Sequence, residues 1–495
     1  MLMQIIVLLL IAAIAYFHYV EGFFSASLSA ILAMIAAMGA FSLHEPVAQL
    51  MIGQKFLPDD AQSISLVVLF GLMYFLPRLA FDNLVSGNVR LPLLVDKIGS
   101  AVLGLFAGVM VLGTMAIALQ ELPFGATVAG YGRYAVLPDR QVAMIPPGGS
   151  NTSNFTISDE VAETVLGSDW GVSAAHPMHH VCTPVEADRW ATKIPPQSSL
   201  AIPVDDMVIA MVSAASQGGL GGDQVLRQLH PDFLLELFAQ RLGIESGQRH
   251  TASNPACTVS TVFLPTESIP VMDDFPDAMR TNSAGNDPPL PVLTSPIKSS
   301  DECKVLVVRT SISDPNGDED ADKIMRLSTS SVRLCMPVGA TWADFYPEGT
   351  LLHAGGTLLL WNKPSDPLFL DFSGGNKPKI VDWVYLVPAD AIREKKLPAG
   401  TFLEFKRNAT ANLDQGVKIA DAIDSAEDGL LRDKWFQESL DRLRTKPPAP
   451  TPPASGKPAP TGAQPPAPSG SQAPAGPIPD LKNRVAPAMT GGNGI

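Results

Sequence analysis

The chain has 495 residues, of which 46% are hydrophobic and 17% charged, and its formal net charge is −14. This acidic balance excludes a protein that holds nucleic acid on a basic surface, because phosphate binding requires clustered Lys and Arg. The mean hydropathy of +0.17 is high for a soluble protein. Apolar stretches near the N-terminus account for the high value.

Four apolar stretches near the N-terminus contain no Asp, Glu, Lys or Arg, namely residues 4–20, 22–43, 61–77 and 98–120. A helix of about 20 apolar residues crosses the hydrocarbon core of a bilayer. The pattern therefore predicts a four-helix membrane domain over residues 1–121, with the lipid bilayer as its first partner.

Basic residues in the short loops predict the orientation of this domain. Arg78, Arg90 and Lys97 lie between the third and fourth apolar stretches. Lys and Arg accumulate in cytoplasmic loops, so this loop is expected in the cytoplasm. Four crossings then place residues 122–495 outside the cytoplasm, and the expected location is the bacterial inner membrane.

The cysteines fit an extracytoplasmic region. All four follow the last apolar stretch, at Cys182, Cys257, Cys303 and Cys335. An even number of cysteines in an oxidising compartment is typical of disulfides, and four cysteines allow three connectivities. The alternative is a set of ordinary buried thiols.

The fourth apolar stretch carries a packing motif. Gly99, Gly104 and Gly108 would form a face of small residues, which lets helix backbones approach closely in lipid. Asp96 is placed as an N-cap or a first-turn charge of the same helix. The glycines are expected to lie against another helix, either of the same chain or of a second copy, which would allow a homo-oligomer.

These features resemble the colicin V production (CvpA) family. The resemblance covers residues 1–121 and rests on Gly22, Asp96, Gly99, Gly104 and Gly108. The chain departs from the family pattern at Gln4, where the family has an Asp, and at Ala107, where it has a basic residue. The resemblance implies a membrane protein of the cell envelope, associated with colicin V production as a toxin biosynthetic process, with no agreed biochemical activity.

The rest of the chain is expected to divide into four parts. Residues 122–300 read as irregular and helical, and residues 301–412 alternate in the manner of strands with turns between them, which predicts a β-sandwich. Residues 413–445 read as helical. Residues 446–495 are rich in Pro and Ala and are expected to be disordered. The predicted fold is thus an α-helical membrane domain, an α+β extracytoplasmic region with a C-terminal antiparallel β-sandwich, and a disordered tail.

Two fragments resemble trypsin-like protease motifs. His176 ends a Ser-Ala-Ala-His sequence, and Ser373 begins a Ser-Gly-Gly sequence. Phe372 stands where such proteases have an Asp, and a helical pattern lies between the fragments where a double β-barrel needs strands. A membrane-tethered serine protease therefore remains an alternative rather than the expectation.

Two groups could hold metal ions. His176, His179, His180 and Cys182 offer nitrogen and sulfur ligands, but Pro177 interrupts any helix through them. Residues 314–322 offer alternating oxygens that could surround Ca²⁺, without the Gly and distal Glu of an EF-hand. A polar loop is the favoured interpretation of each group, so no metal and no cofactor is expected.

The sequence therefore favours a non-enzymatic membrane protein that presents an extracytoplasmic body to envelope proteins not yet identified. The other alternative is a channel or export component for a colicin-like toxin. A channel would require polar residues along the helices, and the four stretches offer few of them.

Overall fold

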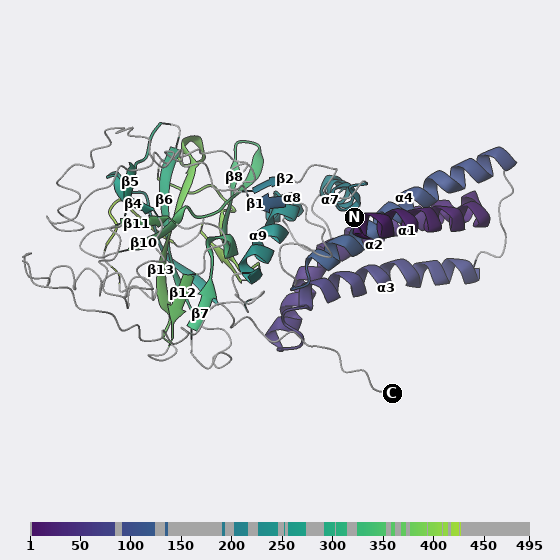
Figure 1. The fold of residues 1–495 in the computed structure, drawn as a ribbon, viewed down its shortest axis with the longest axis horizontal. Helices are drawn as coiled ribbons and strands as arrows, with labels where there is room; N and C mark the ends of the chain where they lie inside the picture. The colour runs from purple at the N-terminus through teal and green to yellow at the C-terminus, as the bar shows by residue number, and fades with distance from the viewer. Residues whose placement is uncertain are drawn as a thin grey trace, which may run out of the picture. The chain divides into compact units, whose positions relative to one another are not determined.

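The computed structural model shows four long helices followed by a strand-rich region (Figure 1). It describes residues 2–84, 92–123, 134–136, 191–193, 202–215, 226–245, 252, 256–273, 292–301, 303–313, 324–352, 358–361, 368–372, 377–393, 395–407, 409–413, 417–424 and 426. By its contacts the chain forms two units, Met1–Thr445 and Lys446–Ile495, and the second lies outside the described residues.

The four predicted membrane helices are present. They are α1 (Leu2–Glu21), α2 (Phe23–Gly53), α3 (Ala61–Leu84) and α4 (Leu93–Gln120). Each is long and apolar enough to cross a bilayer, so the protein is a multi-pass membrane protein.

Two of these helices, α2 and α3, continue several residues past the C-terminal ends of their apolar stretches. The helix α2 continues through Pro46, and α3 continues through Pro77. An apolar stretch is defined to end at the first charged residue, whereas a helix can continue through charged residues. The 31 residues of α2 extend over roughly 46 Å, which exceeds the ~30 Å hydrocarbon core.

Small residues pack the middle of the helical domain. Ala33, Ala36, Ala37 and Ala40 of α2 are fully buried. They share a core with large apolar side chains of α3 and α4, which include Leu66, Phe70, Met110 and Ile117. Alanine on one helix and bulky side chains on its neighbours fill the space between closely spaced backbones.

The described part of residues 122–300, which the sequence predicts to be irregular and helical, includes three helices. They are α7 (Val204–Ala215), α8 (Leu226–Leu229) and α9 (Phe233–Glu245). Phe233, Leu237 and Phe238 of α9 join the apolar core that α2, α3 and α4 form. This core is therefore shared by the membrane helices and the strand-rich region.

The strands form two large, mainly antiparallel sheets. The first has the order β16-β3-β6-β13-β10-β11-β4-β5. Its strands, in chain order, are β3 (Cys257–Phe263), β4 (Ile269–Asp273), β5 (Val292–Ile297), β6 (Cys303–Ile312), β10 (Gly349–Leu352), β11 (Leu358–Trp361), β13 (Lys379–Pro388) and β16 (Lys418–Ala420). Among the described residues of this sheet, the β11–β4 and β16–β3 pairs are parallel and the other pairs are antiparallel.

The second large sheet has four strands in the order β15-β14-β8-β9. They are β8 (Val332–Val338), β9 (Thr341–Phe345), β14 (Phe402–Phe405) and β15 (Ala409–Asn412). Two short pairs join β7 (Ile324–Leu327) to β12 (Leu368–Asp371) and β1 (Tyr134–Val136) to β2 (Ala191–Lys193). The short 3₁₀ helices η1 (Thr329–Ser331) and η2 (Ala389–Ala391) follow β7 and β13.

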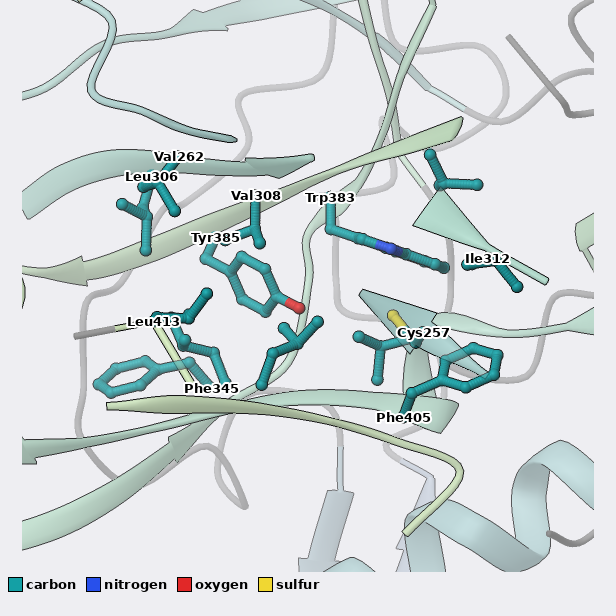
Figure 2. Close-up of a cluster of buried hydrophobic side chains, with 14 of the residues drawn as sticks. Cys257, Val262, Leu306, Val308, Ile312, Phe345, Trp383, Tyr385, Phe405 and Leu413 are labelled. Carbon is teal, nitrogen blue, oxygen red and sulfur yellow. The ribbon is translucent and has the colours of Figure 1, made fainter. Parts of the chain in front are cut away.

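The two large sheets share one hydrophobic core (Figure 2). Leu306 and Val308 of β6 point toward the same interior as Phe345 of β9 and Phe405 of β14. The buried indole of Trp383 donates its Nε1–H to the Thr310 hydroxyl, 2.9 Å away, which satisfies the only polar atom of that ring.

The central strands of the first sheet are buried on both faces. Val305 and Val307 of β6 alternate with Leu306 and Val308 and pack into a separate apolar cluster on the opposite face. Because successive side chains of a strand point to opposite faces, a strand with an unbroken apolar run needs cover on both sides.

Two parts of the sequence interpretation were wrong. Residues 122–300 were read as irregular and helical, yet their last part supplies β3, β4 and β5. The predicted helical segment over residues 413–445 contains strand β16 at Lys418–Ala420. The β3 sequence alternates Thr and Ser with apolar residues, which resembles a polar loop until a neighbour buries one face. The sheet therefore extends past both ends of the predicted 301–412 domain.

Candidate functional site

Asp96 contacts the first residue of a different helix. It lies in the first turn of α4, where the N-cap position is Pro92. Its Oδ1 accepts a hydrogen bond from the backbone N–H of Phe23, 2.9 Å away, so the carboxylate caps α2 rather than its own helix. Gly22 has a φ of 101°, and a Cβ there would lie 3.1 Å from Asp96 Oδ1. Glycine thus permits both the turn and the close carboxylate.

The three glycines of the predicted packing motif face neighbouring helices at different distances. A Cβ on Gly104 would lie 2.7 Å from the Cβ of His18 and 3.1 Å from the Cα of Ala15, both in α1. A Cβ on Gly99 would lie 2.5 Å from the ring of Phe23, and one on Gly108 would lie 3.5 Å from Ile14. The backbones of α1 and α4 are therefore closest at Gly104.

The candidate protease and metal residues lie outside the described residues. These are His176, His179, His180, Cys182, Ser373 and residues 314–322. Their proposed roles stay predictions. Within the described ranges, no three His, Cys, Asp or Glu side chains gather as a metal site.

Three of the four cysteines can be assigned. Cys303 is disulfide-bonded, while Cys257 and Cys335 are buried free thiols. Burial raises the pKa of the Cys257 thiol to about 12, so it is unreactive at neutral pH. Cys182 lies outside the described residues.

The most distinctive polar feature is a cluster of charges where the helix ends meet the strand-rich region. We call it the ionic junction, and it comprises Glu45, Glu121, His230, Glu236, Arg333, Asp344, Glu404 and Arg407. All of these residues are buried except Glu45, which is partly exposed. A buried charge destabilises the fold unless an opposite charge or a hydrogen-bond partner lies next to it. The pairing within the junction therefore determines whether these residues can stay ionised.

Arg407 connects the strand-rich region to the ends of two membrane helices. Its Nη2 donates to Glu121 Oε1, 3.0 Å away at the end of α4, and lies 3.7 Å from Glu45 Oε1 of α2. The guanidinium also lies over the ring of Phe233, 4.8 Å from its centroid. Arg407 and the preceding Lys406 both have positive φ, 61° and 47°, which turns the chain sharply after β14.

His230 bridges a membrane helix and α9. Its Nε2 lies 2.8 Å from Glu45 Oε1, and its Nδ1 lies 2.5 Å from Glu236 Oε2. Burial disfavours the charged imidazolium, but the two carboxylates outweigh it and raise the pKa of His230 to about 10. The ring is therefore a cation at neutral pH, with Nδ1 hydrogen-bonded to Glu236 and Nε2 in an ion pair with Glu45.

Arg333 gathers three carboxylates. Its Nη1 lies 2.7 Å from Asp344 Oδ1 and 3.0 Å from Glu236 Oε1, and its Nε donates to Glu404. Arg333 and Glu404 are directly opposite each other in the β8–β14 register, which fixes this pair. Burial raises the pKa values of Glu404 and Asp344, although the Arg333 guanidinium opposes both shifts.

A small pocket borders the junction. Its lining comes from α9, η1, β8, β14, the residue after β9 and the turn after β14. It comprises Glu236, Gln240, Ser330, Ser331, Arg333, Tyr346, Glu404, Lys406 and Arg407. Acidic and basic groups line it together, so the pocket itself has no strong preference for one sign of charge.

A second polar contact ties α7 and α9 to the end of α4. Gln120 donates from Nε2 to Asp205 Oδ2 of α7 and accepts at Oε1 from Arg241 Nη2 of α9, each over 3.3 Å. All three side chains are buried. The last turn of α4 thus contacts two further helices through one amide.

A separate group of charges lies at the opposite ends of the membrane helices. Arg78 donates to the Ser29 hydroxyl over 2.9 Å and lies 3.4 Å from Glu21 Oε2 and 3.1 Å from Asp82 Oδ2. Lys97 donates to the Tyr19 carbonyl over 2.9 Å. Two of the three basic residues used to predict the orientation therefore lie at the end of the helices away from the ionic junction.

Sequence reasoning missed the ionic junction, although two local signals were present. Arg333 and Glu404 each interrupt an apolar strand, as Val-Arg-Leu and Leu-Glu-Phe. A charge inside such a strand requires a buried partner. Nothing in the sequence indicated which partner that would be.

Comparisons with known proteins do not test the resemblance to the CvpA family. No family model, no curated protein and no solved structure matches the chain. The function must therefore be argued from the site itself.

Proposed function

We propose that this protein is a non-enzymatic integral membrane protein that holds a strand-rich body against the ends of its membrane helices for contact with envelope proteins. The ionic junction carries this proposal. A body on a flexible tether would not need buried charges that the ends of α2 and α4, helix α9 and the three strands β8, β9 and β14 share.

The pairing of the junction supports a structural role. His230 places both ring nitrogens against carboxylates, and Arg333 contacts Asp344, Glu236 and Glu404. Each of these cations is held by acids of the same cluster. A catalytic acid or base must instead reach a substrate.

The packing of the helices disfavours the channel alternative. The middle of α2 presents Ala33, Ala36, Ala37 and Ala40 to bulky apolar side chains of α3 and α4. An aqueous path along that face would need polar lining, and these positions have none.

We further propose that the body is extracytoplasmic and that the membrane is the bacterial inner membrane. Two observations support this orientation. Arg78 and Lys97 lie at the helix ends opposite the junction, where the cytoplasmic loop is expected. The disulfide at Cys303 fits an oxidising compartment.

The finer structural and family assignments belong to the same proposal. We propose that the two sheets around the shared core form a β-sandwich. We also propose that residues 446–495 form a disordered tail. The resemblance at Gly22, Asp96, Gly99, Gly104 and Gly108 supports a place near the CvpA family and a role connected with colicin V production. A homo-oligomer through the membrane helices is compatible with this role.

Complementation of a deletion strain tests the proposal against the protease alternative. The readout is restored envelope integrity, measured as resistance to detergent, with equal protein amounts in the membrane. His176→Ala and Ser373→Ala variants should restore it fully, because we assign neither residue a catalytic role. Loss of function in either variant at a normal amount of folded protein would favour the protease.

The orientation is tested separately. An enzyme active only in the periplasm, fused after residue 200, should be active. If a reporter that is active only in the cytoplasm is active at the same position, the extracytoplasmic assignment is wrong. The proposed structural role of the ionic junction does not depend on this result.

A further inference from the structure

The short helix α7 packs deeply against the membrane helices. Its buried face consists of Val204, Val208 and Val212. A Cβ on Gly113 of α4 would lie 2.3 Å from the carbonyl oxygen of Val204 and 2.4 Å from Val208. The backbones of α4 and α7 therefore approach as closely as glycine allows.

The contacts of α7 lie within the membrane-spanning parts of α1 and α4. Val204 shares an apolar cluster with Val7 and Ile11 of α1 and with Val109 and Ala116 of α4. Gly113 precedes the last residue of α4, Gln120, by seven positions, which is roughly 10 Å along a helix. Since the apolar stretch of α4 continues to Leu119, α7 lies at the depth of the outer part of the hydrocarbon core.

The helix α7 crosses the membrane helices rather than extending them. Figure 1 shows α7 end-on beside α1 and α4, which run across the view. A helix of 12 residues is about 18 Å long and too short to span a bilayer. It is long enough to lie in the plane of the membrane surface.

The two flanks of α7 differ in polarity. Asp205 contacts Gln120 at the end of α4, so the side of α7 that carries Asp205 faces the aqueous end of that helix. Asp206 and Ser213, seven residues apart, lie on this side together with Ile209, which packs against the apolar core shared with α2, α3 and α4. Met207, Met211 and Ala214, spaced four and three residues apart, form the opposite flank, which therefore points along α4 into the membrane. Of these three, Met207 and Ala214 are exposed, and Met211 is partly buried against the same core.

The flank of α7 that points into the membrane continues an exposed apolar surface. Met207 is 47% exposed, although it is a large hydrophobic residue. The neighbouring helix α1 also exposes Ile5, Leu8 and Leu9, close in sequence to the Val7 that packs with Val204. In a membrane protein, lipid acyl chains cover such a surface.

We propose that α7 is a further membrane-embedded segment, which lies in the interfacial zone of the bilayer with Met207 and Ala214 in contact with lipid acyl chains. The body is then held to the membrane by lipid contact as well as by the ionic junction. This inference rests on the membrane helices and not on the proposed cellular role.

Spin-label accessibility in lipid vesicles tests the proposal. Nitroxide labels are attached to Met207→Cys and, in a separate variant, to Ser213→Cys of the full chain. Oxygen concentrates in lipid, while a charged nickel chelate stays in water. The label at 207 should collide with oxygen and avoid nickel, and the label at 213 on the opposite flank should show at least severalfold more nickel contact.

Two reference positions calibrate the measurement. Leu105→Cys on the exposed face of α4 reports acyl chains, and Ala340→Cys in the exposed turn between β8 and β9 reports water. The unsubstituted protein controls for labelling of native cysteines. Nickel contact at 207 equal to that at 340 would overturn the proposal, and an Ala214→Cys variant replaces Met207→Cys if the latter does not fold.

Discussion

The guanidinium of Arg407 donates a hydrogen bond to the Glu121 carboxylate over 3.0 Å, although 286 residues separate the two in sequence. Glu121 immediately follows the last membrane helix, and Arg407 follows a central strand of the four-stranded sheet. The pair therefore joins the membrane domain to the body at its base. The first prediction concerns this pair.

Replacing Arg407 with Met should destabilise the protein by about 3–5 kcal/mol, because Glu121 would remain buried without its cation. The measurement is thermal or denaturant unfolding of the protein in detergent. The matched control is Lys395→Met, which removes a cation from an exposed pair with Asp421 and should cost less than about 1 kcal/mol. Equal effects of the two substitutions would show that the junction contributes no more than a surface pair.

The pH dependence of stability should report on His230. Its pKa is about 10 when folded and 6.5 in the reference state, so its stabilising contribution is fully present below about pH 6.5 and is lost as pH rises through 10. The stability of the unsubstituted protein should therefore fall between pH 7 and 10, by at most ~1.4 kcal/mol per pH unit for one proton.

A His230→Gln variant provides the control for that titration. Glutamine can donate to one carboxylate but carries no proton that titrates in this range. The variant should be less stable at pH 7, and its stability should depend less on pH up to 10. If it shows the same alkaline loss as the unsubstituted protein, the loss arises from another group.

Two glycines of α4 should respond differently to the same substitution. Gly104→Ala places a methyl group 2.7 Å from His18 and close to the α1 backbone, while Gly108→Ala places one in ordinary contact 3.5 Å from Ile14. We expect Gly104→Ala to lower the amount of folded protein in membranes and Gly108→Ala to leave it near normal. The reverse order would mean that α1 and α4 pack through a different face.

The contact between Asp96 and Phe23 predicts a further pair of variants. Asp96→Ala removes the acceptor for the first N–H of α2 and should cost about 1 kcal/mol. Asp96→Asn keeps an oxygen acceptor and should recover much of that loss. The measurement is the midpoint of thermal unfolding of both variants. Identical midpoints for Asp96→Ala and Asp96→Asn would contradict the capping role of Asp96.

The membrane helices could be predicted because their requirement is local. Crossing a bilayer needs about 20 consecutive apolar residues, and that signal survives without any knowledge of neighbours. Strands β6 and β13 lie within residues 301–412, where the alternating pattern, also a local signal, predicted strands. The ends of α2 and α3 were missed because Pro46 and Pro77 lie inside helices that tertiary contacts maintain.

The site could not be predicted because its contacts are distant in sequence. Arg333 meets Glu404 across 71 residues, and Arg309 likewise meets Asp382 across 73. The strand β16 exists only through its parallel pairing with β3, more than a hundred residues earlier. A single sequence shows that such residues need partners but does not show which partners they have.

The distance between a membrane helix and the body tests the central claim most directly. Spin labels at Leu50→Cys, exposed near the end of α2, and at Ala340→Cys in the body would be measured by pulsed electron resonance in lipid vesicles. A body fixed by the ionic junction predicts one narrow distance distribution, which broadens when Arg407→Met is added. A broad distribution in the protein with Arg407 intact would contradict the account, because it would show a body that moves freely on the membrane helices.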